Sequence, residues 1–254
     1  MSVITIIGNG KMAEAICKGL GNSFEVEVLG RNLHKLESFK QNLEVVKIDL
    51  ISNNKNITNK IIVLCVKPYA LADAIKDFEG EADIVISILA GTSLEKIKNL
   101  IKAKSYIRAM PNVGASFQKS MTTLTGDATA RKFATDLFER IGSTLWVGTQ
   151  KELDIATAIA GSGPAYLALV ADALIDGGVA LGLTREDAKK LTVGLFDGFA
   201  NNLTESEPSQ IKASVMSPGG TTAAAICHLE EKSTRSAFIG CVKSAYQKAV
   251  ELSK

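Results

Sequence analysis

Short apolar runs alternate with segments of helical character along the first 150 residues. The runs are rich in valine, isoleucine and leucine, and their length is typical of buried strands rather than helices. Predicted strands cover residues 3–7, 24–29, 60–66, 83–89, 105–109 and 144–147, and predicted helices cover residues 14–20, 71–78, 94–101 and 130–141. Alternating strands and helices favour a parallel, doubly wound sheet with helices on both faces.

After residue 150 the pattern becomes helical, with many alanines and glycines. Pro164 is expected to kink or restart the first helix, and Thr184 to cap the second. Helices are predicted over residues 153–182, 185–203 and 208–216, from residue 222, and over 234–252. Two apolar stripes exceed what one thin layer buries, so we expect a partner subunit to cover them. The stripes are Leu191, Leu195, Phe196 and Phe199, and Phe238, Val242, Tyr246 and Val250.

The first predicted strand runs into a glycine-rich turn and then into a predicted helix. The turn is a G-x-G-x-x-A variant, in which Gly8 permits a tight bend and Gly10 lets a pyrophosphate approach the backbone. Ala13 lets helix and strand pack closely. The pattern alone is weak because chance matches are common, but the order of strand, turn and helix strengthens it. The residues expected to contact a dinucleotide here are Ile7, Gly8, Asn9, Gly10, Lys11 and Met12.

These patterns predict an α/β protein. Residues 1–150 are expected to form a Rossmann-type domain with a doubly wound parallel sheet that binds a dinucleotide. Residues 151–254 are expected to form an all-α domain for dimerisation and substrate binding.

The end of the second predicted strand indicates which dinucleotide is used. NAD-binding folds usually place an acidic residue there to hold the ribose 2′-hydroxyl, whereas this chain has Arg31. A guanidinium can pair with a 2′-phosphate, so we expect NADPH, with NADH as a possible substitute. The alternative is that Arg31 is only a solvated turn residue.

Three other predicted strands end in residues suited to a cofactor cleft, because ligands bind beyond the carboxyl ends of such sheets. Each segment alone is compatible with simple turn chemistry, and together they outline a cleft. The predicted contacts are Val66, Lys67, Pro68, Ala90, Gly91 and Asn112.

A late loop, residues 217–222, has the composition of a small-anion site. Its two glycines let the backbone approach a ligand, and the free amides of the following helix favour negative charge. The hydroxyl groups of Ser217, Thr221 and Thr222 add donors and acceptors. The alternative is an ordinary loop with a helix cap.

Composition and charge exclude several classes of protein. The chain has 254 residues, 46% of them hydrophobic, and a net charge of +2, which argues against a nucleic-acid-binding surface. The four cysteines are expected to be reduced thiols in the core. No metal site is expected, because the cysteines lack metal-ligand spacing and the two histidines are far apart in the sequence. No signal-peptide pattern opens the sequence and no apolar run reaches transmembrane length, which predicts a cytoplasmic protein without a membrane partner.

Six motifs together resemble the pyrroline-5-carboxylate reductase family across the whole chain. They occupy residues 8–13, 66–68, 108–112, 161–166, 176–179 and 217–222. The resemblance implies NAD(P)H-dependent reduction of 1-pyrroline-5-carboxylate to L-proline, the last step of proline biosynthesis. It also implies a homodimer formed through the helical domain, often assembled into a decamer, with the site between subunits.

The resemblance also implies roles for individual residues. The substrate carboxylate is expected to bind at Ser217, Gly219, Gly220, Thr221 and Thr222. The Thr222 hydroxyl is expected to bond the ring nitrogen, and Glu205 to stabilise a protonated imine. The alternative for Glu205 is a solvated charge at a helix end. The sequence departs from the family at residues 113–115, Val-Gly-Ala instead of Thr-Pro-Ala, which implies a freer loop.

Two other functions stay open at this point. One is another imine or β-hydroxyacid reductase of the same two-domain plan. A hydroxyacid enzyme needs a general acid, which is normally a lysine. The candidates here are Lys189, Lys190 and Lys212, and no motif singles out any of them. The other is a non-catalytic, NADP-responsive binding protein.

Overall fold

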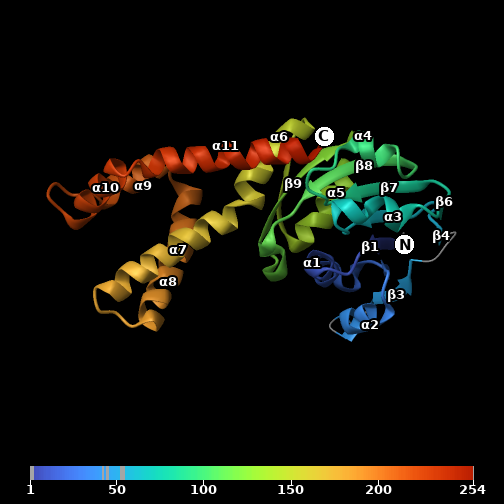
Figure 1. Cartoon of the computed structure of the whole chain (residues 1–254), viewed down its shortest axis with the longest axis horizontal. Coiled ribbons are helices and arrows are strands. Elements are labelled where there is room, and N and C mark those ends of the chain that lie inside the picture. The colour runs from blue at the N-terminus through green and yellow to red at the C-terminus, as the bar shows by residue number, and fades with distance from the viewer. Residues whose placement is uncertain (1–2, 42, 44–45, 52–54, 254) are drawn as a thin grey trace. The chain divides into compact units, whose positions relative to one another are not determined.

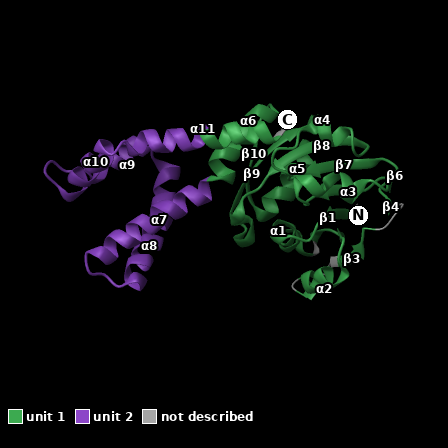
Figure 2. Ribbon diagram, in the orientation of Figure 1, with its two compact units in different colours: residues 1–162, 244–254 green, residues 163–243 purple. Residues whose placement is uncertain are grey.

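The computed structural model describes residues 3–41, 43, 46–51 and 55–253. The chain divides into two compact units, which Figure 2 shows in different colours. Unit 1 comprises residues 1–162 together with 244–254, and unit 2 comprises residues 163–243. The domain boundary that we place at residue 150 stays a prediction.

Unit 1 is built on a sheet of eight strands within the described residues, in the order β10-β9-β8-β7-β5-β1-β2-β3 (Figure 1). These strands are β1 (Ile4–Ile7), β2 (Val26–Gly30), β3 (Val46–Leu50), β5 (Ile61–Leu64), β7 (Ala82–Ser87), β8 (Ala103–Met110), β9 (Ser120–Gly126) and β10 (Gly142–Trp146). A separate short pair joins β4 (Lys55–Asn56) to β6 (Phe78–Glu79). The strand order runs outward in both directions from β1 and β5, as the doubly wound fold requires.

Helices cover both faces of this sheet. One face packs against α1 (Lys11–Leu20), α2 (Leu33–Gln41) and α5 (Arg131–Phe138). The other packs against α3 (Leu71–Ile75) and α4 (Leu94–Lys98). The central strands β1 and β5 are buried along their whole length, which explains why their sequences are continuous apolar runs rather than alternating ones.

The sheet is not parallel throughout, which differs from what the sequence predicts. Strands β8 and β9 are antiparallel, so the sheet is parallel everywhere except at this pair. The sequence analysis missed β9, because its buried positions include Thr122, Thr123 and Thr125 rather than an apolar run. It also missed β3 and α2, and the helix predicted over residues 71–78 ends at Ile75, with Phe78 in β6.

The connection to unit 2 is helical but not one continuous helix. Helix α6 (Gln150–Ala156) leads into a π-helical turn, Thr157–Gly161, and α7 (Gly163–Ala180) starts one residue later. Pro164 therefore stands in the first turn of α7, where its missing N–H is tolerated. Our expectation that no apolar run reaches transmembrane length was wrong, because residues 150–180 are long and apolar enough by length and composition. This is weak evidence for a membrane, since apolar helices of soluble proteins pass the same test.

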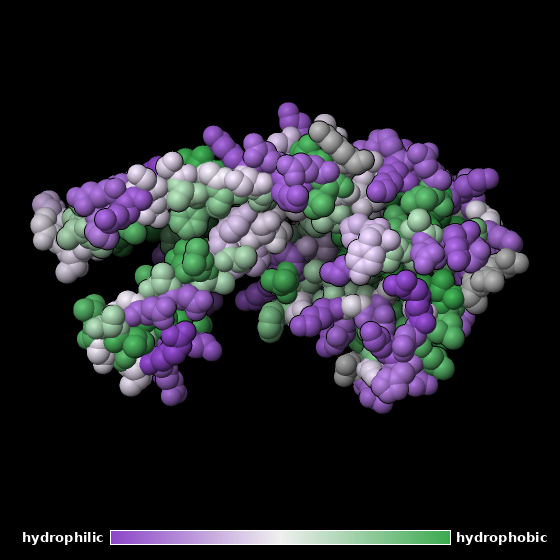
Figure 3. Space-filling model, in the orientation of Figure 1, coloured by the Kyte–Doolittle hydropathy of each residue, from purple (hydrophilic) through white to green (hydrophobic). Residues whose placement is uncertain are grey.

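Unit 2 continues with α8 (Arg185–Glu205), α9 (Pro208–Val215), α10 (Thr221–Glu231) and most of α11 (Thr234–Ser253). The predicted cap of α8 is confirmed, because the Thr184 hydroxyl accepts a hydrogen bond from the Asp187 amide at 3.1 Å. Apolar residues are visible on the surface of this unit in Figure 3. Leu191 and Leu195 are 63% and 57% exposed, so much of the predicted stripe is uncovered in the single chain.

Candidate active site

The glycine turn after β1 has the geometry that its sequence predicts. Gly8 has φ +116°, a conformation that side chains with a Cβ rarely adopt, and its amide donates to Leu29 O at 2.8 Å. Gly10 caps α1 without a side-chain hydrogen bond, and a Cβ added there would meet nothing within 4 Å. Because the first amides of a helix have no intrahelical partners, this turn leaves donors and open space for an anion.

A hollow of about 190 Å³ joins this turn to the residue that indicated NADP. Arg31 lines it together with Gly8, Asn9 and Gly10. The Arg31 side chain is exposed and has no ion pair with any residue that the structure describes. It is therefore free to take an anionic partner.

Tyr69 lines the same hollow and is 87% exposed, and the sequence analysis missed it. An aromatic ring in this position offers a flat surface to a base or sugar. The available signal was an aromatic residue directly after the predicted strand-end contacts Lys67 and Pro68.

A second hollow, of about 460 Å³, extends along the carboxyl ends of β5, β7 and β8. Gly10, Cys65, Val66 and Lys67 line both hollows, so the two are continuous along the sheet edge. The second hollow also brings together predicted contacts from three different segments. These are Lys11, Met12, Pro68 and Ala90, with Pro111 beside them.

Three predicted cofactor contacts serve visible roles within the protein. Ile7 is fully buried, and its carbonyl accepts from the Cys65 amide at 2.8 Å. Gly91 has φ +62°, and a Cβ there would be 2.4 Å from Leu252 Cβ, so its glycine also allows the end of α11 to pack. The Asn112 amide bonds Gly114 and Ala160 at 3.0 Å each. Their contact with a cofactor stays a prediction.

The late loop of unit 2 is a tight turn that ends at a helix. The Gly220 amide donates to Ser217 O at 3.0 Å, with Pro218 and Gly219 between them, and Gly219 has φ +72°. Proline followed by a glycine with positive φ is the pattern of a type II turn. Gly220 then caps α10 without a side-chain hydrogen bond, which leaves the first helical amides, from Thr221 onward, unpaired within the helix. This geometry suits a carboxylate.

Thr222 lines an apolar hollow of about 500 Å³ formed with α8 and α9. Leu195, Phe199, Ile211 and Val215 supply its apolar walls. Glu205 does not line this hollow: it is the last residue of α8, and the Thr204 hydroxyl lies 3.4 Å from its carboxylate. Glu207, two residues later, caps α9 through a reciprocal bond with Gln210.

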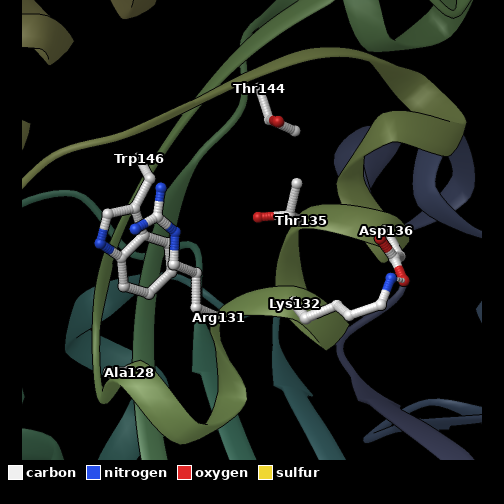
Figure 4. A pocket seen from close by; sticks show the side chains of 7 residues that line it. All are labelled: Ala128, Arg131, Lys132, Thr135, Asp136, Thr144 and Trp146. Atoms are coloured by element: carbon white, nitrogen blue, oxygen red, sulfur yellow. Dashed lines mark hydrogen bonds and ion pairs between the residues drawn. The ribbon is translucent and has the colours of Figure 1, made fainter.

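A further hollow lies on α5 and β10 and contains none of the predicted site residues (Figure 4). Its cationic groups already have partners: the Arg131 guanidinium stands 5.2 Å from the Trp146 ring centroid, and Lys132 pairs with Asp136 at 2.8 Å. We therefore exclude it from the candidate site.

Two of the four thiols, those of Cys17 and Cys65, have pKa values raised by burial, that of Cys17 to about 12. The expectation that all four cysteines lie in the core was wrong for Cys227, which is exposed in this chain, and Cys241 is half-buried. No group of three potential metal ligands was found among the described residues.

Comparisons with known proteins agree with this geometry. Residues 150–252 match the family model described as pyrroline-5-carboxylate reductase dimerisation, and residues 3–91 match the model described as NADP oxidoreductase, coenzyme F420-dependent. The pyrroline-5-carboxylate reductase of Corynebacterium melassecola is 34% identical, with 100% of each chain covered. The chain belongs to the pyrroline-5-carboxylate reductase family.

Solved structures of this family have the same fold. A pyrroline-5-carboxylate reductase from Coxiella burnetii is 33% identical with a TM-score of 0.85, covering 100% of this chain and 99% of that one. A Plasmodium falciparum pyrroline carboxylate reductase with NADP bound is 26% identical with a TM-score of 0.84, covering 100% and 98%. The Rossmann-type sheet and the helical C-terminal region predicted from the sequence are therefore confirmed.

Proposed function

We propose that this chain reduces 1-pyrroline-5-carboxylate to L-proline with NADPH, the last step of proline biosynthesis. The observation that carries the proposal is the full-length identity of 31–36% with reductases of that name. NADH is expected to act as a weaker substitute, because only the 2′-phosphate distinguishes the two coenzymes at Arg31.

The residues of unit 1 fit a dinucleotide. Gly8 is required for the close approach of β1 and β5, since a Cβ there would lie 2.8 Å from Cys65 O. Gly10 faces open space, where a pyrophosphate has room next to the first amides of α1. Arg31 and Tyr69 would hold the adenosine end, and Val66, Lys67 and Ala90 would line the remainder of the cleft. When bound, NADPH supplies the hydride for the reduction.

The residues of unit 2 would hold the substrate. The free amides at the start of α10 and the Ser217 hydroxyl would bind its carboxylate. The Thr222 hydroxyl would bond the ring nitrogen, which favours the protonated imine and its reactivity. Glu205 would stabilise the same positive charge at longer range.

We further propose that the protein works as a homodimer that can assemble into a decamer, and that it resides in the cytoplasm. The exposed apolar residues of α8 support a protein partner. Thiols without disulfides among the described cysteines suit a reducing compartment. Neither nucleic acid nor membrane is expected as a partner.

The test is an assay at 340 nm with NADPH and 1-pyrroline-5-carboxylate. Saturable loss of absorbance and formation of proline would support the proposal. Turnover only with a β-hydroxyacid and NADP⁺ would indicate the second enzyme class, and tight NADPH binding without any turnover would indicate a binding protein.

A further inference from the structure

Asn112, two residues after the end of β8, ties the loop that follows this strand to the π-helical turn. Its Nδ2 donates to Ala160 O at 3.0 Å, and its Oδ1 accepts from the Gly114 amide at 3.0 Å. Both ends of the amide are therefore used, one in the loop after β8 and one in the π-helical turn.

The acceptor, Ala160 O, has a special place in the chain. In an α-helix this carbonyl would receive the amide four residues later, and that residue is Pro164, which has no N–H. The proline ring would also collide with the same carbonyl in a regular helix. The π-helical turn Thr157–Gly161 lies directly before α7, and Ser162 donates back to Thr157 O at 2.9 Å. Asn112 thus supplies a donor where Pro164 cannot.

A second contact anchors the preceding helix independently. Arg108, also on β8 and 2% exposed, donates to Asp154 of α6 at 2.8 Å. Loss of the Asn112 bond therefore leaves α6 attached to the sheet and releases only the π-helical turn. Pro111, which directly precedes Asn112, lines the cofactor cleft, so the side chain that bonds the π-helical turn stands next to a residue of the cleft wall.

We propose that Asn112 is a positioning residue for the reduction: it acts through Ala160 O, in place of the amide that Pro164 lacks, and holds the π-helical turn against the cleft wall at Pro111. It does not act through contact with the cofactor. The proposal rests on the reductase function proposed above, and π-helical turns within helices are frequent at functional sites.

The first test uses Asn112→Asp and Asn112→Ser. Both side chains keep an oxygen that can accept from Gly114. An ionised aspartate has no donor for Ala160 O, and the serine hydroxyl, one bond closer to the backbone than the amide nitrogen, is too short to reach both partners. We expect kcat to fall roughly tenfold, since small displacements of reacting groups cost up to about 100-fold, while the Kd for NADPH changes less than about twofold. Asn56→Asp is the matched control: Asn56 is exposed, also accepts an amide bond, and lies on β4.

The second test is a double-mutant cycle with Pro164→Ala, which restores an amide four residues after Ala160. In that background Asn112→Ser is expected to lower kcat by less than about twofold, because the helix now supplies the donor. Hydrogen exchange gives a readout independent of activity: in Asn112→Ser, residues 157–163 should exchange faster while residues 150–156 keep their protection.

Several outcomes would overturn the proposal. Equal losses of kcat in both backgrounds would show that the Ala160 bond is not what matters. A rise in the Kd for NADPH that matches the fall in kcat would instead make Asn112 a cofactor contact. A lower Tm with unchanged kcat would reduce its role to stability. If the wild-type protein reduced no imine, the proposed function would fail. Unchanged exchange at residues 157–163 in Asn112→Ser would separately refute the coupling between Asn112 and the π-helical turn.

Discussion

Gly8 and Cys65 meet backbone to backbone: a Cβ on Gly8 would lie 2.8 Å from the carbonyl oxygen of Cys65. The same turn contains Gly10, where a Cβ would touch nothing within 4 Å. One glycine is therefore required by the protein itself, and the other leaves space for a ligand.

Gly8→Ala and Gly10→Ala should consequently differ. Gly8→Ala is expected to lower the free energy of unfolding by at least about 1–3 kcal/mol, because its φ is strained for alanine and the contact is with backbone. Gly10→Ala should change stability by less than about 1 kcal/mol yet raise the Kd for NADPH roughly tenfold. Denaturant unfolding and NADPH titration measure the two effects. If Gly10→Ala and the wild type bound NADPH with equal affinity, the pyrophosphate would not bind at this turn.

Arg31 should determine coenzyme preference. Arg31→Ala is expected to weaken NADPH by about 1.5–3 kcal/mol, roughly 10- to 150-fold, and to leave NADH almost unchanged, because only NADPH has the 2′-phosphate. Tyr69→Ala is the comparison within the same hollow and should weaken both coenzymes alike. Steady-state KM values for each coenzyme test this, and equal losses in Arg31→Ala would show that Arg31 does not contact the phosphate.

Thr222→Ala should separate substrate chemistry from cofactor binding. Loss of one hydrogen bond to a charged group is expected to lower kcat/KM for the imine by about 1.5–3 kcal/mol with unchanged NADPH affinity. Thr222→Ser keeps the hydroxyl and should retain much of the activity. If Thr222→Ala turned over normally but had a lower Tm, the loop would serve only as a helix cap.

Gly220→Val tests the neighbouring position of the loop. A Cβ on Gly220 would lie 2.4 Å from the Ser217 hydroxyl, so a bulkier side chain should displace that hydroxyl and block approach of the carboxylate. We expect a higher KM for the imine with little change in kcat. An unchanged KM would place the substrate carboxylate elsewhere.

Glu27 should make the free energy of unfolding depend on pH in the acidic range. Burial acts to raise the pKa of Glu27, but hydrogen bonds from Lys55 and Lys60, each 3.0 Å away, outweigh it and hold the pKa below its usual value. A lowered pKa stabilises the folded state fully above the pKa of an unfolded glutamate, about 4.3, and the effect is lost as the pH falls through the folded value.

Glu27→Gln should therefore lower the free energy of unfolding by about 1–3 kcal/mol near neutral pH, with a shrinking difference from the wild type below pH of about 4. Urea unfolding across this range measures it. Glu25→Gln, which removes an exposed pair with Lys47, is the control and should change little. A difference independent of pH would show that the charge of Glu27 is not responsible.

The sequence by itself determined the order of elements in unit 1 and the chemistry of its turns. Continuous apolar runs specified the central strands because those strands are buried on both faces, and glycines specified turns because few other residues adopt positive φ. Local signals of this kind act over a few residues. They were sufficient for the Gly8–Gly10 turn, the cap at Thr184 and the loop of residues 217–222 that leads into a helix.

Tertiary structure decided what depends on partners distant in the chain. Strand β9 escaped prediction because buried threonines interrupt its apolar pattern, and its antiparallel direction depends on the pairing with β8. Tyr69 and Arg31 are far apart in the sequence, and only folding brings them to the same hollow. The bond from Asn112 to Ala160 spans 48 residues and compensates for Pro164, and no local pattern encodes such a relation because a proline's missing donor can be replaced from anywhere in the fold.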